Sequence, residues 1–185
     1  WVKGTIYSGS DGGIYKSVNK GGDWLDLSKN IGIRQVYRLS CSKTNTNVIN
    51  IGSQDNGTTI RQTTGQWKDW LGADGMDNMI SPTNENIAFG TSQNGYLYKT
   101  TDAGKSMVSL ERPSSGNWIT PFVMHPTNHD TIYAGWQGVW RSVNGGLKFT
   151  KISGSSITGN LNCLALAPTN TKYIYASTNN VLFRS

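Results

Sequence analysis

The sequence contains little of what helical proteins, membrane proteins and metalloenzymes require. Of its 185 residues only 15% are charged and 2 are histidines. No stretch holds apolar residues at helical spacing without an interrupting glycine or proline, which argues against long helices. No apolar run reaches the roughly 20 residues of a membrane helix, so we expect no membrane insertion. No His, Cys and carboxylate spacing is typical of zinc, and we therefore expect no cofactor.

The charge that is present is dispersed along the chain. The formal net charge is +6, yet Lys or Arg recurs at intervals of about 40 residues, at positions 16, 61, 99, 141 and 184. A cation that repeats at this interval is typical of a solvated strand edge rather than of a nucleic-acid groove. We expect no nucleic-acid partner.

What the sequence has in abundance is an internal repeat. The segments 14–24, 97–107 and 139–149 are close copies, 59–67 is a weaker copy, and 182–185 repeats the opening of the motif. A second motif, containing Thr-Asn, recurs in phase with the first at 42–45, 81–84, 125–128 and 167–170. Each Thr-Asn motif precedes a short apolar strand. A period of about 40 residues that carries several strands is typical of a propeller blade.

The repeat predicts an all-β fold, a β-propeller segment of four-stranded antiparallel blades. We expect about four and a half blades in one propeller domain. These are a partial blade of three strands at 1–28, complete blades at 29–71, 72–111 and 112–152, and a partial blade of three strands at 153–185. Open blade edges are unfavourable, so we expect the chain to be part of a larger propeller of about six to eight blades or more.

The strongest copies resemble a known family motif, the Asp-box or bacterial neuraminidase repeat, in which Ser/Thr, Asp, Gly, Ser/Thr and Trp are spaced along a turn. The matching positions are Ser17, Asn19, Gly21 and Trp24; Thr100, Asp102, Gly104 and Ser106; and Ser142, Asn144, Gly146 and Phe149. Asn replaces Asp in two copies, and Met107 replaces Trp in the other. The resemblance implies a propeller of the sialidase, xyloglucan hydrolase and sortilin-like superfamily.

The register of Gln54-Asp55-Asn56-Gly57 and Asp74-Gly75-Met76-Asp77 between the boxes also resembles propellers of large secreted bacterial proteins, including cargo of type IX secretion. This resemblance implies a bacterial protein that is secreted or held at the cell surface. The boxes themselves need no ligand to explain them. Asp or Asn can accept hydrogen bonds from amides just ahead, Gly takes the positive φ, and the aromatic residue can pack over the turn. We therefore expect the box residues to be structural.

A binding site is expected on the rim opposite the boxes, where loops of a rigid scaffold gather. The candidate ligand-binding residues there are Gln54, Asp55, Asn56, Gln93, Asn94, Trp118, Trp136 and Gln137. Trp118 and Trp136 could form an aromatic platform for sugar rings or could simply plug the rim. The segment 54–58 is either a hairpin turn of the Asn-Gly type or a ligand-contacting loop.

The sequence offers few catalytic groups. Asp74 and Asp77 are the only candidates, and both are weak. Asp77 could bind a cation such as calcium, act as an acid or base, or pair with Arg38. A sialidase would need converging arginines and a Tyr–Glu pair, whereas the arginines here repeat with the blade period. We expect Cys41 and Cys163, which lie in equivalent strands of different blades, to be buried thiols that form no disulfide.

These observations favour a non-catalytic extracellular propeller that serves as a binding or protein-interaction module. The expected partners are the remaining blades of the propeller or an associated protein, with a carbohydrate or peptide as ligand. Two alternatives stay open. One is a fragment of a glycoside hydrolase of the xyloglucan hydrolase or sialidase type, and the other is a sortilin-like propeller that binds a peptide.

Overall fold

The computed structural model describes residues 4–29, 32 and 34–185. The described residues form 18 short strands in five antiparallel sheets, with one short 3-10 turn, η1 (Gln93–Gly95). Residues 1–3 of the partial blade predicted at 1–28 lie outside the described residues, and its first described strand begins at Ile6. No helix in the described part of the chain is long and apolar enough to cross a membrane. The predicted all-β propeller fold is confirmed.

Each sheet is a meander of consecutive strands. The first contains β1 (Ile6–Ser10), β2 (Gly13–Ser17) and β3 (Leu25–Asp26). The second contains β4 (Val36–Cys41), β5 (Ile49–Ser53), β6 (Gly57–Arg61) and β7 (Trp67–Leu71). The third contains β8 (Asn78–Ile80), β9 (Ala88–Ser92), β10 (Tyr96–Thr100) and β11 (Val108–Ser109). The fourth contains β12 (Phe122–His125), β13 (Asn128–Ala134), β14 (Trp140–Ser142) and β15 (Thr150–Lys151), and the fifth contains β16 (Cys163–Leu166), β17 (Ile174–Ser177) and β18 (Leu182–Arg184).

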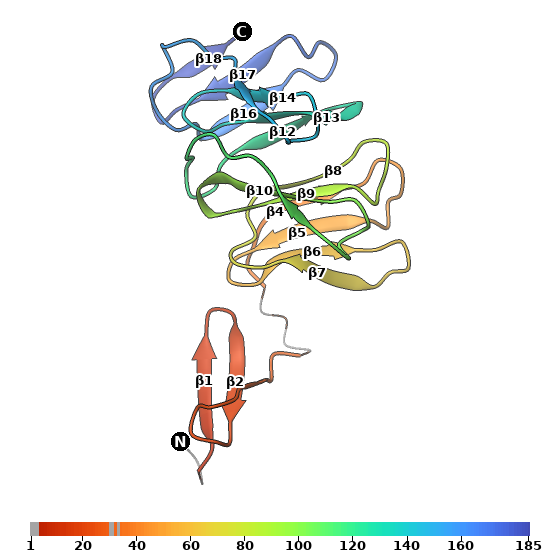
Figure 1. Ribbon diagram of the computed structural model, residues 1–185, viewed down its shortest axis with the longest axis vertical. Helices are drawn as coiled ribbons and strands as arrows, with labels where there is room; N and C mark the ends of the chain where they lie inside the picture. Colours follow the sequence, from red (N-terminus) through yellow and green to blue (C-terminus); the bar gives the residue numbers. More distant parts are fainter. Residues whose placement is uncertain (1–3, 30–31, 33) are drawn as a thin grey trace.

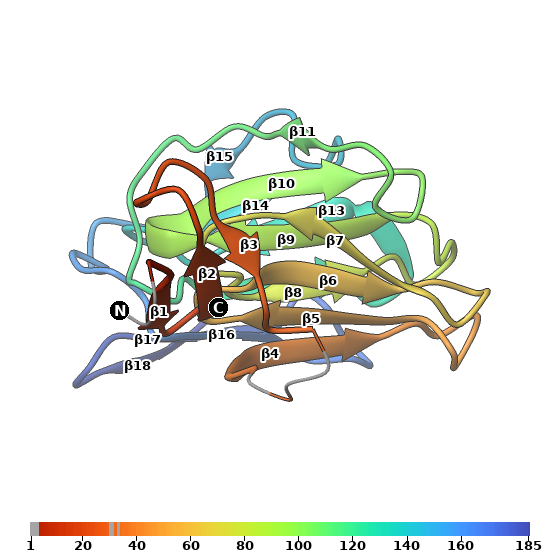
Figure 2. The same cartoon turned by 90° about the horizontal axis from the view of Figure 1, so that it is seen from below.

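The sheets follow one another in space as they do in the chain. Figure 1 shows the second to fifth sheets stacked face to face, with the first sheet standing apart at the N-terminal end. Figure 2 looks along this stack, so that strands of successive sheets overlie one another. The strand pairing repeats from sheet to sheet, as the partners Cys41 and Ile49, Ile80 and Ala88, Met124 and Ile132, and Leu166 and Ile174 show. The first strands of these four sheets are therefore equivalent in register.

The apolar core is divided among the junctions between neighbouring sheets. Ile60, Trp70 and Ala88 belong to the cluster between the second and third sheets. A second cluster, which includes Phe89 and Trp136, lies between the third and fourth sheets, and a third, which includes Leu161, lies between the fourth and fifth. Each sheet therefore stabilises its neighbours rather than one common centre.

The expectation of buried thiols is wrong, because Cys41 and Cys163 are both exposed free cysteines. Side chains alternate between the two faces of a strand. Ser40 hydrogen-bonds to Asn78 of the third sheet, at 2.6 Å between Oγ and Oδ1, so Cys41 points to the other face of β4. Leu164 packs toward the fourth sheet, so its neighbour Cys163 points away from that sheet. The two cysteines thus lie on the uncovered faces of their strands.

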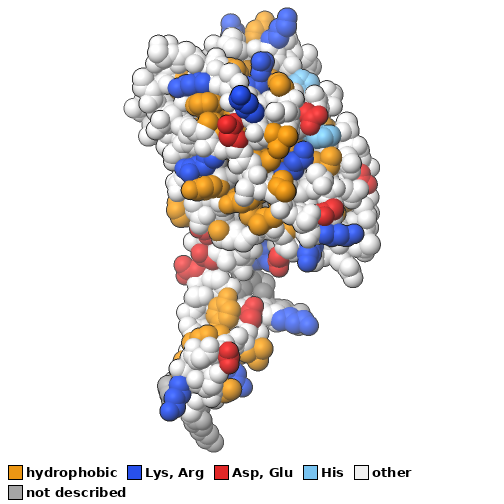
Figure 3. Space-filling view, viewed as in Figure 1, with side chains coloured by type: hydrophobic (Ala, Val, Ile, Leu, Met, Phe, Trp, Pro, Cys, Tyr) orange, Lys and Arg blue, Asp and Glu red, His pale blue; other side chains and the backbone are white. Residues whose placement is uncertain are grey.

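Lysine and arginine side chains are spread over the molecular surface. On the face shown in Figure 3, Lys and Arg lie singly among polar and apolar groups, and no basic groove is visible.

Candidate functional site

The loops of the stack form two rims, which differ in their hydrogen bonds. We call the rim that carries the turns 18–24, 101–107 and 143–149 the box rim. There the amide of Ala103 donates to Asn86 O and the amide of Gly145 to Asp130 O, each at 2.9 Å. We call the opposite rim, with the turns 54–56, 93–95, 136–138 and 178–180 and the connections 72–77, 112–121 and 152–162, the connector rim. On it each of three turns is bonded to a connection between sheets, for example Gly57 N to Ala73 O at 2.9 Å.

The three box turns share one hydrogen-bond pattern. The first hydroxyl of each turn accepts from the glycine amide, with 2.9 Å between Gly21 N and Ser17 Oγ, Gly104 N and Thr100 Oγ1, and Gly146 N and Ser142 Oγ. The three glycines have φ of 93°, 83° and 88°, which favours glycine. Asn19, Asp102 and Asn144 each accept a hydrogen bond at 2.8 to 3.0 Å from an amide further along the turn, those of Asp23, Lys105 and Lys148.

The carboxylate of Asp102 is fully engaged inside its own turn. The Ser106 hydroxyl donates to Oδ2 at 2.6 Å and the Ser106 amide donates to Oδ1 at 2.9 Å. These bonds, together with those from Thr100 and Lys105, lower the pKa of Asp102 from 3.8 to about 2. The last residue of each box differs in exposure. Phe149 is buried, whereas Trp24 and Met107 are 46% and 47% exposed. The hydrogen bonds of the box residues are thus made within their own turns.

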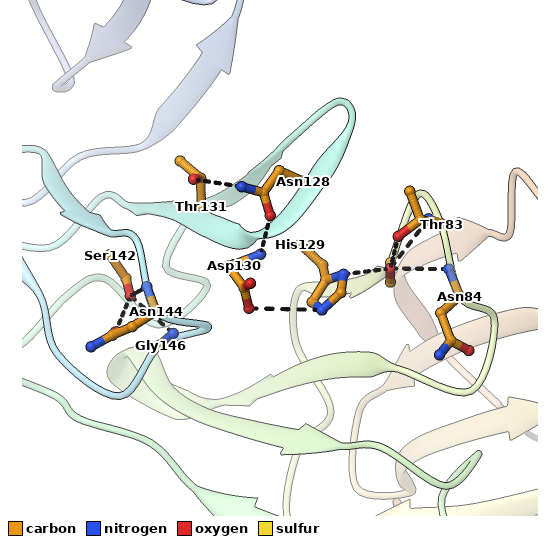
Figure 4. A network of polar contacts seen from close by, with 10 residues as sticks. Thr83, Asn84, Asn128, His129, Asp130, Thr131, Ser142, Asn144 and Gly146 are labelled. Atoms are coloured by element: carbon orange, nitrogen blue, oxygen red, sulfur yellow. Dashed lines mark hydrogen bonds and ion pairs between the residues drawn. The ribbon is translucent and has the colours of Figure 1, made fainter.

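A polar network connects the box rim of the third sheet to that of the fourth (Figure 4). His129 Nδ1 lies 3.1 Å from Ser81 Oγ, and His129 Nε2 lies 3.7 Å from Asp130 Oδ1. The carbonyl of Asp130 accepts from the amide of Gly145 in the third box turn. Among the described residues no group of three or more His, Cys, Asp or Glu is arranged to hold a metal ion. His129 thus has a structural explanation.

On the connector rim, Asp74 brings several of the predicted ligand-binding residues together. Its side chain, only 8% exposed, accepts from the amide of Asp55 and from Nε2 of Gln93, both at 2.6 Å. Gln54 accepts from the Tyr37 hydroxyl at 3.1 Å, and Asn56 Nδ2 donates to Gln54 O at 3.0 Å. These residues hold the turns of the second and third sheets to the connection between them.

The carboxylate of Asp55 differs from that of Asp74 because it is exposed and its side chain bonds no neighbouring sheet. Partial desolvation and the charges of Asp74 and Asp11 raise the pKa of Asp55. Its backbone φ of 55° lies in the left-handed region, as suits a tight turn. Asp55 thus remains open to solvent, as does Asp11 beside it.

Close packing between backbone segments explains Gly52 and Gly75 on the connector rim. A Cβ on Gly75 would lie 2.1 Å from Gly57 O, and one on Gly52 would lie 2.1 Å from Met76 O. The connection 72–77 therefore lies against the β5–β6 hairpin with backbone touching backbone. The sequence suggested a ligand loop or a hairpin turn here, and the structure shows a hairpin whose glycines serve packing.

Asp77 joins the inner strands of the third and fourth sheets. Its Oδ1 accepts from the amide of Asn78 at 2.9 Å and its Oδ2 from the amide of Phe122 at 3.1 Å. Burial raises the pKa of Asp77, while these two hydrogen bonds and the charge of Arg38 oppose the rise. Pairing with Arg38, one of the three roles left open for Asp77, is not found as an ion pair, since the ion pairs of the described residues are Arg34–Asp69 and His129–Asp130. Backbone amides take the place of the predicted arginine.

Trp136 does not belong to an exposed aromatic platform. It is fully buried, its Nε1 donates to Gly95 O at 3.0 Å, and Phe122, Trp140 and Phe149 contact it edge to face. This corrects the platform interpretation, because the ring fills the junction between the third and fourth sheets. The neighbouring Gln137 is exposed and forms an isolated β-bridge with Asn160.

Trp118 does lie at the surface of the connector rim, where it is 51% exposed. Its carbonyl accepts from the amide of Asn94 at 3.2 Å, so its backbone is tied to the turn of the third sheet. The same turn ends at Tyr96, which is 49% exposed and has the Arg112 guanidinium 4.0 Å from its ring centre. Sequence reasoning missed Tyr96, although its place two residues after the predicted rim residue Asn94 was a usable signal.

Comparison with known proteins shows the fold. No family model and no curated protein matches the chain. Among solved structures the chain is similar to an ancestral GH74 enzyme, with 23% identity and a TM-score of 0.62 over 94% of this chain and 25% of that one. It is also similar to the Niastella koreensis GH74 enzyme, with 16% identity and a TM-score of 0.64 over 82% of this chain and 28% of that one. A third similar structure is the GH74 xyloglucanase from Xanthomonas campestris, with 14% identity and a TM-score of 0.64 over 82% of this chain and 29% of that one. The chain thus spans less than a third of the length of each.

Proposed function

We propose that this chain is a non-catalytic propeller segment that binds a neutral polysaccharide on its connector rim, as part of a secreted or cell-surface bacterial protein. The box turns are Asp-box repeats that hold the opposite rim. The similar solved structures are GH74 enzymes, one of them named a xyloglucanase, and this supports a polysaccharide as the ligand class.

The observation that carries the proposal is the exposed aromatic ring of Trp118 on a rigid rim, with Tyr96, one face of which is covered by Arg112, in the turn to which Trp118 is bonded. Aromatic faces bind the apolar faces of sugar rings, and an amphipathic ring that is half exposed is suited to this contact. The backbone of both aromatic residues is fixed, because the Trp118 carbonyl accepts a hydrogen bond from the Asn94 amide and Tyr96 is the first residue of β10. A ligand would therefore meet preorganised contacts.

The state of the carboxylates supports a non-catalytic role. Asp74 and Asp77 each accept two hydrogen bonds from the protein. Glycoside hydrolysis generally needs two carboxyl groups that face each other across the bond to be cleaved. On the connector rim, Asp55 is the acidic group that combines a raised pKa with an exposed side chain.

Isothermal titration with a xyloglucan oligosaccharide tests the proposal. Replacement of Trp118 with Ala should weaken binding about tenfold, because a stacking contact is lost. Trp24→Ala is the matched control, since Trp24 is 46% exposed but lies on the box rim, and it should bind like the wild type. An unmodified chain that binds no neutral oligosaccharide, or equal losses in the two variants, would overturn the proposal.

One alternative is favoured by specific observations, namely that the chain contributes to a glycoside hydrolase. The three similar structures are GH74 enzymes, and the pKa of Asp77 is raised, as a general acid requires. Release of reducing ends from xyloglucan decides between the two. Under our proposal the chain releases none, whereas activity that Asp77→Asn abolishes would establish the alternative.

A further inference from the structure

An apolar pocket lies where the outer strands of the fourth sheet meet the fifth sheet. It has a volume of about 260 Å³, and its apolar lining residues are Val139, Ile152, Ile157, Ile174, Ala176 and Phe183. Serine and glycine residues and Arg184 complete the lining. Ile152 is 39% exposed, so part of this apolar surface is open to solvent.

The internal repeat places the same lining at the junction between the third and fourth sheets. The amide of Ile152 donates to Val139 O, and that of Leu110 donates to Leu97 O, each at 2.9 Å. Ala176 is paired with Phe183 in the fifth sheet in the same way as Ala134 is paired with Trp140 in the fourth. In this register the counterparts of Val139, Ile152, Ile174, Ala176 and Phe183 are Leu97, Leu110, Ile132, Ala134 and Trp140.

At the junction between the third and fourth sheets, an aromatic ring is packed among these counterparts. Phe149, the last residue of the third box turn, is buried in a cluster that includes all five of them or has them packed against it. Ile132 is fully buried there, whereas its counterpart Ile174 is only partly buried. The pocket beside the fifth sheet thus has the lining that surrounds an aromatic ring one junction earlier.

The strand next to the pocket has an unpaired edge. In the part of the chain that the structure describes, β18 is paired with β17 alone, whereas the third strands of the second to fourth sheets each pair with a fourth strand. In the fourth sheet that strand is β15, which begins directly after Phe149. Its residues Thr150 and Lys151 pair with Arg141 and Trp140. A strand edge of this kind accepts an added strand.

We propose that the pocket and the edge of β18 form a docking site for an extended segment of a partner protein, which adds a fourth strand to the fifth sheet. An aromatic side chain directly ahead of that strand enters the pocket, in the way that Phe149 packs one junction earlier. Backbone hydrogen bonds along β18 supply affinity, and the apolar lining selects Phe or Trp over small or charged side chains. The site goes beyond polysaccharide binding and does not include Trp118.

Fluorescence anisotropy with a labelled peptide of residues 145–152 tests the proposal, because this segment contains Phe149 and β15. The full chain should bind the peptide, and amides of β18 should exchange more slowly in the complex. Phe149→Ala in the peptide should weaken binding about tenfold, because the ring is lost from the pocket. A peptide with proline at positions 150 and 151 should also bind weakly, since proline has no amide hydrogen to donate to β18.

Substitutions in the chain test the pocket itself. Ile152→Asp places a charge in the apolar lining and should abolish peptide binding. Leu182→Asp is the matched control, since Leu182 belongs to β18 but is 72% exposed and does not line the pocket. This variant should bind the peptide like the wild type. The peptide variants leave the chain unchanged, so they decide the question even if Ile152→Asp does not fold.

No binding of the 145–152 peptide, or equal binding of its Phe149→Ala version, would overturn the proposal. Unchanged exchange of the β18 amides in the complex would contradict strand addition. Light scattering identifies the other occupant, a second copy of this chain. The expected result is a monomer that binds the peptide. Association that rises with concentration and that Ile152→Asp abolishes would assign the pocket to a second copy and overturn the choice of a partner protein.

Discussion

At the scale of single residues, Asp102 stabilises a turn through bonds that depend on its charge. Its pKa in the folded protein is about 2, below the ordinary value of 3.8, chiefly because Ser106 donates through both its hydroxyl and its amide. A depressed carboxylate pKa means that the unfolded state binds the proton more readily. The contribution of Asp102 to stability is therefore present above about pH 4 and is lost as the pH falls toward 2.

Asp102→Asn tests this pH dependence. Asn occupies the equivalent position in the other box turns, at Asn19 and Asn144, so the variant should fold. Unfolding by denaturant should show that the wild type loses more stability than the variant between about pH 4 and pH 2. Parallel pH profiles for the two proteins would show that the carboxylate charge does not stabilise the turn.

At the scale of elements, the connection 72–77 depends on close contact with the β5–β6 hairpin. We expect Gly75→Ala to destabilise the protein by about 1–3 kcal/mol, because a Cβ there forces two backbone segments apart. The added atom would lie 2.1 Å from Gly57 O and 2.7 Å from Thr58 Oγ1. Chemical unfolding measures the change in free energy.

Gly72→Ala is the matched control for this prediction. Gly72 lies in the same connection, but a Cβ on it would meet no atom within 4 Å. Its replacement should leave stability unchanged or raise it slightly, since alanine restricts the unfolded chain. If the two variants unfold alike, the contact between connection and hairpin does not limit stability.

Turns and strands could be predicted from the sequence where the interactions that stabilise them join residues close together in the chain. The box turns could be predicted because each hydroxyl, carboxylate and glycine acts on atoms within a few residues, as Thr100 and Gly104 do. The place of Trp136 could not, because its partner Gly95 is 41 residues away in another sheet. The same holds for Asp77, which meets the amide of Phe122 in the next inner strand. Contacts between blades depend on how the sheets stack, which a periodic sequence does not specify.

In the candidate site, too, contacts between different sheets could not be predicted from the sequence. The opposite rim was identified from the alternation of turns along the repeat, and Trp118 lies there as an exposed ring. The engagement of Asp74 with Asp55 and Gln93 had no sequence signal, because it joins two turns through a connection.

At the scale of the whole molecule, the division of the core among junctions predicts local rather than uniform loss of structure. Leu161 is fully buried in the cluster between the fourth and fifth sheets, which it shares with Ile157 and Ala176. Leu161→Ala removes apolar contacts there and should cost about 2–5 kcal/mol in the stability of that junction. Because repeat proteins are stabilised by nearest-neighbour interfaces, the loss should stay close to the mutation.

Hydrogen exchange measured on peptides distinguishes local loss of structure from uniform loss of structure. In Leu161→Ala, amides of β17 and β18 should exchange faster, while those of β5 and β6, two junctions away, should keep their protection. Leu182→Ala is the control in the same sheet, since Leu182 is 72% exposed and its truncation should change exchange little. An equal rise in exchange across all sheets in Leu161→Ala would mean that the stack unfolds as one cooperative unit. In that case the junctions would not be independent sources of stability.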